Sequence, residues 1–317
     1  MDFLANYFGS LNPMSFLSAL PGNIAQGIIW GLMGLGVFLT FKLLNFADLS
    51  VDGSFATGGA VTAVMLINGC PVWATIIVAI LAGLAAGLVT GLLHTLLGIP
   101  DILAGILTQI ALYSINLNIM GKSNLPISYR NYTLVVSASN INMAILVGLG
   151  ICAVVIAAMY WYFGTEQGST IRSTGSNPAM SKAQGININF TKVIALALSN
   201  GLVALSGSLF AQYQGFADIN MGRGAIVIGL AAVIIGEVIF GKIFTNFGLT
   251  LLAVSIGAII YYIVLQIVLQ LGLNTNDLKL ITALIVAVFL AIPYWKSKMF
   301  RRKVQPQSAK NGGNGHA

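Results

Sequence analysis

Two short polar stretches in an otherwise apolar sequence hold most of the side chains that could contact a small solute. These side chains are Asp48, Asp52 and Ser54 in the first stretch and Asp218, Asn220 and Arg223 in the second. Each stretch precedes a short apolar segment, which predicts a half-helix whose N-terminus presents free N–H groups and a partial positive charge. An aspartate there is either a simple helix cap or a cap that also takes part in gating or solute passage. Both interpretations stay open at this point.

Glu237 is the one acid that lies well inside a predicted membrane span. An ionisable side chain at the bilayer centre costs about 3 kcal/mol on insertion scales, so it indicates either a function or a partner. Lys242 follows in the sequence, and pairing of the two side chains near the cytoplasmic interface is the structural interpretation. A role of Glu237 in the solute pathway is the alternative.

Gly236–Lys242 fits the first seven positions of a phosphate-binding P-loop, but Ile243 stands where Ser or Thr should coordinate Mg²⁺. The stretch also ends an apolar span instead of joining a strand to a helix. Cys70 and Cys152 have no Cys-x-x-Cys pattern or histidine nearby, which supports neither a metal site nor a disulfide framework. We therefore predict that the chain is not an enzyme and has no catalytic residues, no metal and no cofactor of its own.

The composition indicates which surroundings these residues have. Hydrophobic residues make up 57% of the 317 residues and charged residues 7%, against roughly 25% charged in an ordinary soluble domain. Most of the outer surface must therefore face the lipid bilayer, which excludes a soluble enzyme, a nucleic-acid-binding domain and a disordered chain. The net charge of +7 arises largely from basic residues after Trp295. Such a tail predicts a cytoplasmic C-terminus in a multi-pass cell-membrane protein.

Apolar runs bounded by polar residues, Pro or Gly predict the membrane spans. The runs are 24–44, 54–67, 72–97, 102–119, 142–163, 193–212, 224–241, 246–271 and 278–294. Two of them, 54–67 and 224–241, are too short for a hydrocarbon core of about 30 Å and should be half-helices. Residues 1–20 are predicted to form an interfacial helix or a short extra span. The predicted fold is an all-α polytopic membrane protein of about nine to ten transmembrane helices.

An internal repeat suggests how these spans are organised. Phe46–Val51 is similar to Phe216–Met221, which lies 170 residues later, and each copy follows a full span and introduces a short one. An odd number of crossings separates the copies, which predicts two inverted repeats with discontinuous helices, a transporter design. The predicted parts of the chain are the segment 1–20, a first half 21–163, a cytoplasmic segment 164–192, a second half 193–295 and a basic cytoplasmic tail 296–317.

Three glycines, Gly83, Gly87 and Gly91, recur every four residues on one face of a predicted span. This spacing lets two helix backbones approach closely in a membrane. We predict that the face packs against another helix, either within the chain or in a second copy.

The sequence of the polar segment 164–192 predicts a short helix. Asn177 and Pro178 are favourable at the start of a helix, and Gly185 is favourable at its end. A short cytoplasmic helix between two membrane halves would suit a docking element. The alternative is a solvated loop with an interfacial helix.

The same segment carries a family resemblance. Thr174-Gly-Ser-Asn-Pro178 followed by Ala183-Gln-Gly-Ile-Asn187 resembles the cytoplasmic coupling segment of the ABC-importer permeases for branched-chain amino acids and ribose-type sugars. The turn Asp48–Gly53 is similar to the Asp-Leu-Ser-Val-Gly turn of the sugar members, with Asp52 inserted. The resemblance covers about residues 22–294, and the span spacing is closest to a Gram-positive subgroup found beside lipoproteins that bind aromatic amino acids.

The resemblance implies a permease homodimer of ten-helix subunits that works with two ABC ATPase subunits, which bind ATP and Mg²⁺, and with an extracellular substrate-binding lipoprotein. The residues implied to contact the ATPase are Arg172, Thr174, Gly175, Asn177, Pro178, Ala183, Gly185 and Asn187. The cargo expected is an amino acid of the aromatic or branched-chain class.

Three alternatives remain at the level of sequence. The chain could fill the same permease role for a sugar or nucleoside. It could be an ion-coupled secondary transporter, in which Asp48, Asp218 and Glu237 would bind and release the ion. A membrane-embedded enzyme is the third alternative, but no paired His/Asp cluster within the spans supports it.

Overall fold

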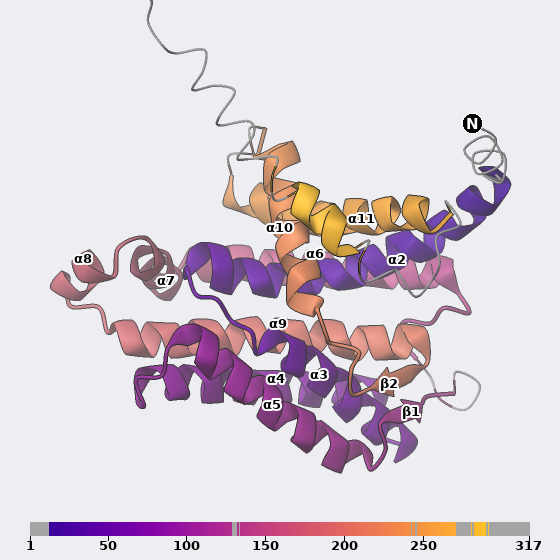
Figure 1. Ribbon diagram of the computed structural model, residues 1–317, viewed down its shortest axis with the longest axis horizontal. Helices are drawn as coiled ribbons and strands as arrows, with labels where there is room; N and C mark the ends of the chain where they lie inside the picture. The colour runs from indigo at the N-terminus through magenta and orange to yellow at the C-terminus, as the bar shows by residue number, and fades with distance from the viewer. Residues whose placement is uncertain are drawn as a thin grey trace, which may run out of the picture.

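The computed structural model describes residues 13–128, 132, 134–241, 243–244, 246–270, 280, 282–289 and 291. These residues are almost entirely helical (Figure 1). The elements, in chain order, are α2 (Pro13–Val37), the π-helix η1 (Phe38–Leu43), α3 (Val51–Ile67), α4 (Val72–Thr95), α5 (Asp101–Met120), β1 (Asn124–Pro126), α6 (Ile141–Phe163), α7 (Glu166–Ser176), α8 (Pro178–Ala183), α9 (Ile188–Gln214), β2 (Phe216–Asp218), α10 (Ala225–Phe240) and α11 (Phe247–Gln270).

Six helical stretches of the described residues are long and apolar enough to cross a membrane. They are Leu17–Leu43, Val72–Thr95, Asp101–Met120, Ile141–Phe163, Ile188–Gln214 and Phe247–Gln270. The two segments predicted as half-helices form the shorter apolar helices α3 and α10. The fold is therefore that of a polytopic helical membrane protein. The run predicted at 278–294 lies partly outside the described residues, and its described residues are helical.

The structure differs from the prediction at the N-terminal end. The first predicted span starts at residue 24, whereas α2 starts at Pro13 and continues through Pro21 without a break. Residues 1–12 of the segment predicted at 1–20 lie outside the described residues. The short pairing of β1 with β2, antiparallel with Asn124 opposite Asp218, was not predicted.

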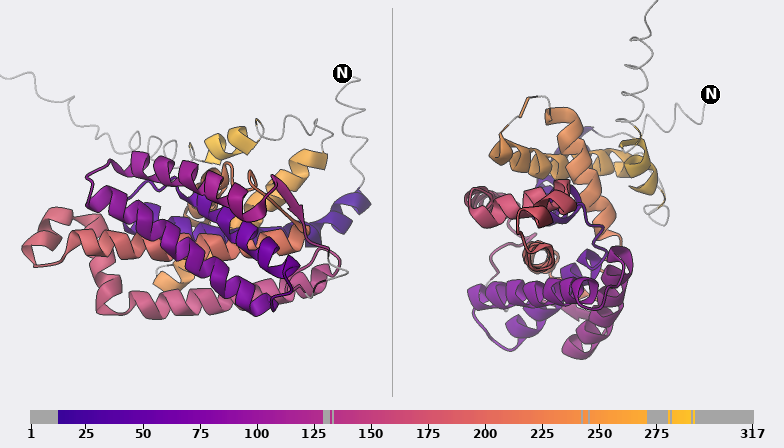
Figure 2. Two further views of the ribbon diagram at one scale, coloured as in Figure 1. Left: turned by 90° about the horizontal axis from the view of Figure 1, so that it is seen from below. Right: turned by 90° about the vertical axis from the view of Figure 1, so that its left-hand side faces the viewer.

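Helix α9 occupies the centre of the molecule. It lies between a layer formed by α3, α4 and α5 and a second layer that contains α2, α10 and α11 (Figures 1 and 2). It packs along α4, α3 and α2, while α11 packs along α2 and α10. Most of α2 and α9 is buried, whereas α5 and α6 are mostly exposed. The inner helices thus form the core, and the outer ones present apolar surface suited to lipid.

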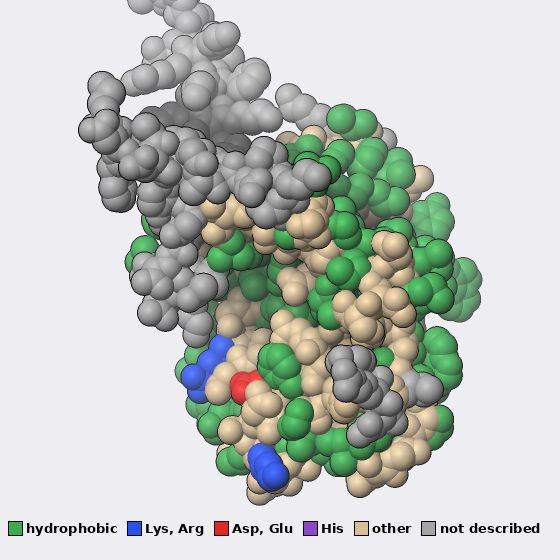
Figure 3. All heavy atoms as spheres, turned by 90° about the vertical axis from the view of Figure 1, so that its right-hand side faces the viewer, with side chains coloured by type: hydrophobic (Ala, Val, Ile, Leu, Met, Phe, Trp, Pro, Cys, Tyr) green, Lys and Arg blue, Asp and Glu red, His purple; other side chains and the backbone are tan. Residues whose placement is uncertain are grey.

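The two ends of the molecule differ in character. Helices α7 and α8 extend beyond the bundle at one end, and the β1–β2 pair lies nearer the other (Figure 1). Figure 3, which views the side nearer the β1–β2 pair, shows hydrophobic side chains over much of the described surface and few charged ones. Charged side chains are therefore sparse among the described residues on this end of the bundle.

Close packing between helices depends on glycine. At Gly83, Gly87 and Gly91 of α4, an added Cβ would collide with Asn200 and Ala204, with Leu196, or with Val193 of α9. The three glycines therefore lie on an intramolecular contact, where two backbones approach directly.

Candidate functional site

The first polar stretch is held by a buried hydrogen-bond network. One carboxylate oxygen of Asp48 accepts a hydrogen bond from the N–H of Ser50 at 2.9 Å, and the other accepts one from Asn200 Nδ2 at 2.8 Å. The hydroxyl of Ser54 donates to Asn200 Oδ1 at 2.6 Å. All four side chains are buried. Asp48 and Ser54 thus serve here to anchor the start of α3 to α9.

This network determines where α3 begins along the length of α9. Asn200 lies near the middle of α9, which has 27 residues and so is about 40 Å long. Because Asp48 and Ser54 both bond to Asn200, α3 begins roughly halfway along the neighbouring span. This hydrogen-bonded contact therefore lies far from both ends of α9.

The second polar stretch repeats the local turn of the first. Asp218 Oδ1 accepts a hydrogen bond from the N–H of Asn220 at 2.7 Å, the same i to i+2 turn that Asp48 forms with Ser50. The surroundings differ, because Asp218 lies in β2 and its other oxygen accepts a bond from Asn124 at 3.3 Å. The structure thus places Asp218 and Asn220 beside the β1–β2 pair, apart from the Asp48 network.

Asp52 joins the two stretches. Its oxygens accept hydrogen bonds from the N–H groups of Gly224 and Ile226, each at 2.9 Å, so this residue of α3 caps the N-terminus of α10. A carboxylate at this place interacts favourably with the helix dipole. Gly222 lies so close to the carbonyl of Asp52 that an added Cβ would collide with it. The N-termini of α3 and α10 therefore meet.

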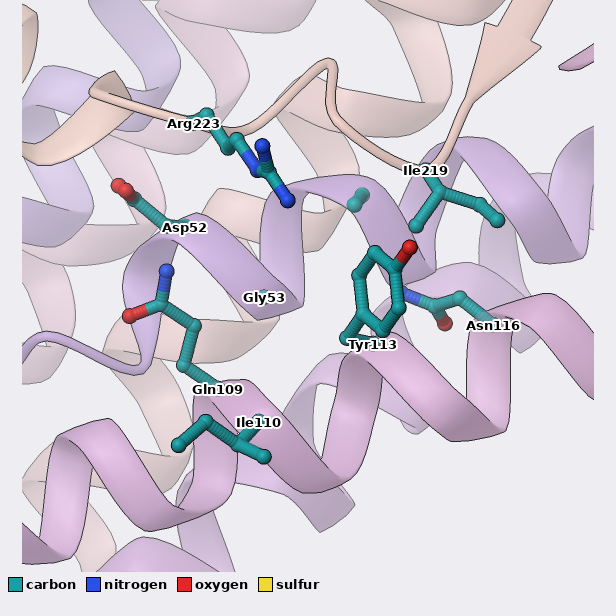
Figure 4. A pocket seen from close by; sticks show the side chains of 9 residues that line it. Asp52, Gly53, Gln109, Ile110, Tyr113, Asn116, Ile219 and Arg223 are labelled. Carbon is teal, nitrogen blue, oxygen red and sulfur yellow. The ribbon is translucent and has the colours of Figure 1, made fainter. Parts of the chain in front are cut away.

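A cavity of about 260 Å³ opens where they meet, between α3, α5 and the segment that leads into α10 (Figure 4). It is lined by Asp52, Gly53, Ala56, Gln109, Ile110, Tyr113, Asn116, Ile219 and Arg223. The guanidinium of Arg223 lies over the ring of Tyr113, 6.0 Å from its centroid, a favourable cation–π arrangement. Asp52 and Arg223 were predicted as pathway residues, and the structure places both on this cavity.

Three polar lining residues on α5 were not predicted from the sequence. Gln109, Tyr113 and Asn116 lie at i, i+4 and i+7 of α5, which puts them on one helix face. Asn116 is 1% exposed, and neither its Nδ2 nor its Oδ1 has a hydrogen-bond partner within the described residues. A polar stripe on an apolar helix was the signal that could have identified them.

Glu237 pairs with a base that the sequence analysis did not consider. Its carboxylate lies 2.7 Å from Lys42 Nζ, so α10 is linked to η1, and each side chain is about half exposed. Lys242, the predicted partner, lies outside the described residues. Glu237 does not line the cavity. Its position therefore fits a link between two helix ends.

The segment 164–192 forms two short helices at the end of the bundle. The predicted helix start is confirmed, because α8 begins at Pro178 with Asn177 as its cap, accepting from the N–H of Met180 at 3.1 Å. α8 ends at Ala183, Gly185 follows with a φ of +82°, and Asn187 caps α9 through the N–H of Phe190 at 3.1 Å. Helix α7, just before α8, was not predicted.

Helix α7 is seated firmly against the bundle. Gly175 contacts the carbonyl of Leu43 so closely that an added Cβ would collide with it. Arg172 donates to the carbonyl of Phe163 at 2.6 Å and lies 5.4 Å from the ring centroid of Phe247. Thr174 is buried, and its hydroxyl has no partner within the described residues. These three residues therefore hold α7 in place, while Asn177 and Pro178 are exposed on α8.

The sequence of the chain is similar to those of known membrane transport proteins. A sequence model described as "Branched-chain amino acid transport system / permease component" matches residues 22–292. The chain is 44% identical to the tyrosine transport system permease protein of Clostridioides difficile, over 87% of this chain and 91% of that protein. It is 32% identical to an uncharacterised Rickettsia prowazekii protein, over 84% and 95% of the two chains. It is 28% identical to the D-allose transport system permease protein of Escherichia coli, over 75% and 74%.

Proposed function

Because the chain belongs to the family of branched-chain amino acid transport system permease components, we propose that it forms the membrane pathway of an ATP-driven importer for an amino acid, with aromatic amino acids as the first candidates. The chain is a membrane transport subunit and not an enzyme. The 44% identity to a tyrosine permease over most of both chains supports an amino acid as cargo. The D-allose permease, at 28%, is more distant.

The observation that carries the proposal is the cavity at the junction of α3 and α10. Arg223 lines it at about half the depth of α9 and is exposed. A charged side chain that faced lipid at this depth would cost about 3 kcal/mol or more. We therefore assign this face to a water-accessible pathway, formed with a second copy of the chain. Asp52 and Arg223 would line it, Asp218 and Asn220 would lie toward one end, and Asp48 and Ser54 would position α3.

The proposed inverted repeat is supported by reciprocal contacts between α2 and α9. Ser199 donates to the carbonyl of Gly36 at 2.8 Å, and Ser206 donates to the carbonyl of Ile29 at 2.7 Å. An offset of 170 converts position 29 into 199 and 36 into 206, so it exchanges the two pairs of contacting positions, with both donors on α9. A two-fold axis between antiparallel helices requires this reciprocity.

A second contact supports the same axis. Asp52 and Gly222 are themselves related by the same offset of 170 positions, and they touch at the junction of α3 and α10. Equivalent residues can meet only close to the axis that relates them. We accordingly propose two inverted halves, 21–163 and 193–295, with nine to ten spans.

We further propose that α7 and α8 dock in a cleft of an ABC ATPase. Asn177, Pro178, Ala183 and Gly185 are exposed and would contact the ATPase, whereas Arg172, Thr174 and Gly175 seat α7 on the bundle. Closure of the ATPase on ATP shifts the permease only if it binds one conformation more tightly. The orientation that follows places α7, α8 and the basic tail 296–317 in the cytoplasm, and an extracellular lipoprotein delivers the cargo at the opposite side.

A connected series of contacts could carry this movement to the cavity. Gly175 of α7 touches Leu43 at the end of η1. The neighbouring Lys42 pairs with Glu237 of α10, and the other end of α10 is capped by Asp52 at the cavity. Displacement of α7 would therefore act on both ends of α10.

Uptake by the reconstituted complex tests the proposal. The permease is placed in proteoliposomes with an ABC ATPase and a substrate-binding lipoprotein of the same organism, and uptake of labelled L-tyrosine, L-leucine and D-allose is measured with enclosed ATP. We expect ATP-dependent uptake of an amino acid and none with an ATPase that lacks its Walker A lysine. Uptake of D-allose alone, or uptake driven by an ion gradient without the ATPase, would show that the assignment is wrong.

A further inference from the structure

The cavity between α3, α5 and residues 219–223 holds Arg223, which forms no ion pair within the described part of the chain. The only acid that lines it is Asp52, whose two oxygens are already bonded to the N–H groups of Gly224 and Ile226. Among the described residues, the single ion pair joins Lys42 and Glu237. Arg223 therefore lines the cavity without an ion pair to any carboxylate of the described residues, and its planar fork of donors is suited to a carboxylate from outside.

A buried amide faces the same space. Asn116 is 1% exposed, it lines the cavity, and both of its polar side-chain atoms lack a partner within the described residues. An unpaired buried amide costs about 1–3 kcal/mol, which a bound polar ligand would recover. The donor Nδ2 and the acceptor Oδ1 of Asn116 thus indicate that this wall of the cavity binds a polar ligand.

The two groups lie on opposite walls with an aromatic ring between them. Figure 4 shows Arg223 descending from the segment that leads into α10, while Tyr113 and Asn116 rise from α5. The ring of Tyr113 stands beside the guanidinium. The volume of about 260 Å³ falls just below the range of about 300–1,000 Å³ for drug-sized ligands. The cavity therefore suits one small solute.

We propose that this cavity is a binding site for the amino acid within the permease itself. Arg223 holds the α-carboxylate, Asn116 forms a hydrogen bond with another polar group of the amino acid, and Tyr113 packs against its side chain. The inference rests on the proposed transport function and adds a selective step to it. A neutral sugar has no carboxylate for Arg223, so the site favours amino acids over sugars. Selection would thus occur in the membrane as well as outside it.

Thiol labelling tests the site without relying on transport. In a background with Cys70→Ser and Cys152→Ser, Ile110→Cys places a thiol on the cavity wall, and Ile115→Cys is the matched control, exposed on α5 but outside the lining. Both variants are labelled in lipid nanodiscs with an anionic and a cationic methanethiosulfonate. We expect the Ile110→Cys thiol to react about tenfold faster with the anionic reagent, and the Ile115→Cys thiol to show no such preference.

Arg223 and the solute are then varied. Arg223→Gln should abolish the preference for the anionic reagent, and Arg223→Lys should keep it. An excess of L-tyrosine should slow labelling of Ile110→Cys severalfold, whereas tyramine, which lacks the carboxylate, should not. Equal rates with both reagents, or equal protection by L-tyrosine and tyramine, would overturn the assignment.

Uptake by the wild-type complex separates the two possible failures. If wild type imports L-tyrosine with ATP but labelling shows neither charge preference nor protection, this inference is wrong and the proposed function stands. If wild type imports no amino acid, the proposed function fails, and the inference fails with it because it rests on that function.

Discussion

The carboxylate of Asp52 accepts a hydrogen bond from the N–H of Gly224 at 2.9 Å, although 172 positions separate the two residues. A helix is normally capped by a residue just before it. Here the residue just before α10 is Gly224 in a left-handed conformation, which offers no side-chain acceptor, and the cap comes from α3. The start of one short helix is thereby tied to the start of the other.

Removing this cap should weaken the junction. We expect Asp52→Ala to lower the free energy of unfolding by about 1–2 kcal/mol, since it exposes N–H groups of α10 without an acceptor. Asp52→Asn keeps one acceptor oxygen and should have a smaller effect. Thermal unfolding in detergent measures both. Equal stability of Asp52→Ala and wild type would mean that the cap contributes nothing.

Substitutions in the hydrogen-bond network of Asp48, Ser54 and Asn200 should lower the free energy of unfolding more than loss of the Asp52 cap does. Asn200→Ala removes the amide that bonds Asp48 and Ser54 and leaves a buried carboxylate with fewer partners. We expect a loss of about 2–3 kcal/mol, measured by thermal unfolding. Asp48→Asn in the same background should recover part of the loss, because a neutral amide is less costly to bury. No recovery in the double variant would argue that the charge of Asp48 does not matter.

Seating of α7 can be tested at a single glycine. Gly175→Val would force α7 away from Leu43, and we expect it to lower the ATP hydrolysis that loaded lipoprotein stimulates by about tenfold, because overpacking costs about 1–3 kcal/mol. Gly150→Val is the matched control, since an added Cβ there meets no atom within 4 Å. Equal stimulated ATP hydrolysis by Gly175→Val and Gly150→Val would show that the contact of α7 with η1 has no part in coupling ATP hydrolysis to transport.

The pairing of Glu237 distinguishes the two transport mechanisms. Exposed ion pairs contribute about 0–1 kcal/mol, so Glu237→Gln should keep ATP-driven uptake within about fivefold of wild type. The reversed pair, Lys42→Glu with Glu237→Lys, should recover what is lost. An ion-coupled transporter that uses Glu237 would instead lose gradient-driven uptake entirely. Uptake in proteoliposomes with either energy source decides between them.

Much of the fold follows from apolar run length, because a span must be long and continuous. The start of α2 was missed because Pro21 looks like a boundary, yet a helix can pass a proline in its early turns when neighbouring groups satisfy the freed carbonyl. α7 was missed because Glu166–Ser176 is polar and rich in Ser, Thr and Gly. Its helix depends on seating against η1, which is a tertiary contact.

The candidate site was only partly predictable. Asp52 and Arg223 were predicted because each lies in a polar stretch beside the start of a predicted half-helix. Asn200 was not, since one amide in an apolar helix gives no periodic signal, and its importance arises from Asp48, a residue distant in sequence. The pairing of Glu237 with Lys42 likewise depends on how α10 crosses the end of η1. Such contacts depend on how the helices pack, and short-range sequence patterns do not predict them.

The contact of α11 with α2 has a consequence for biogenesis. Gly27 and Gly31 of α2 lie directly against the backbone of α11 at Ile259 and Ser255, yet α11 begins only at Phe247. At roughly 5–20 residues per second, the ribosome completes α11 on the order of ten seconds or more after α2. During that interval the glycine-lined groove of α2 has only lipid, or an insertion chaperone, to cover it. The final packing of the earliest helix therefore awaits one of the latest.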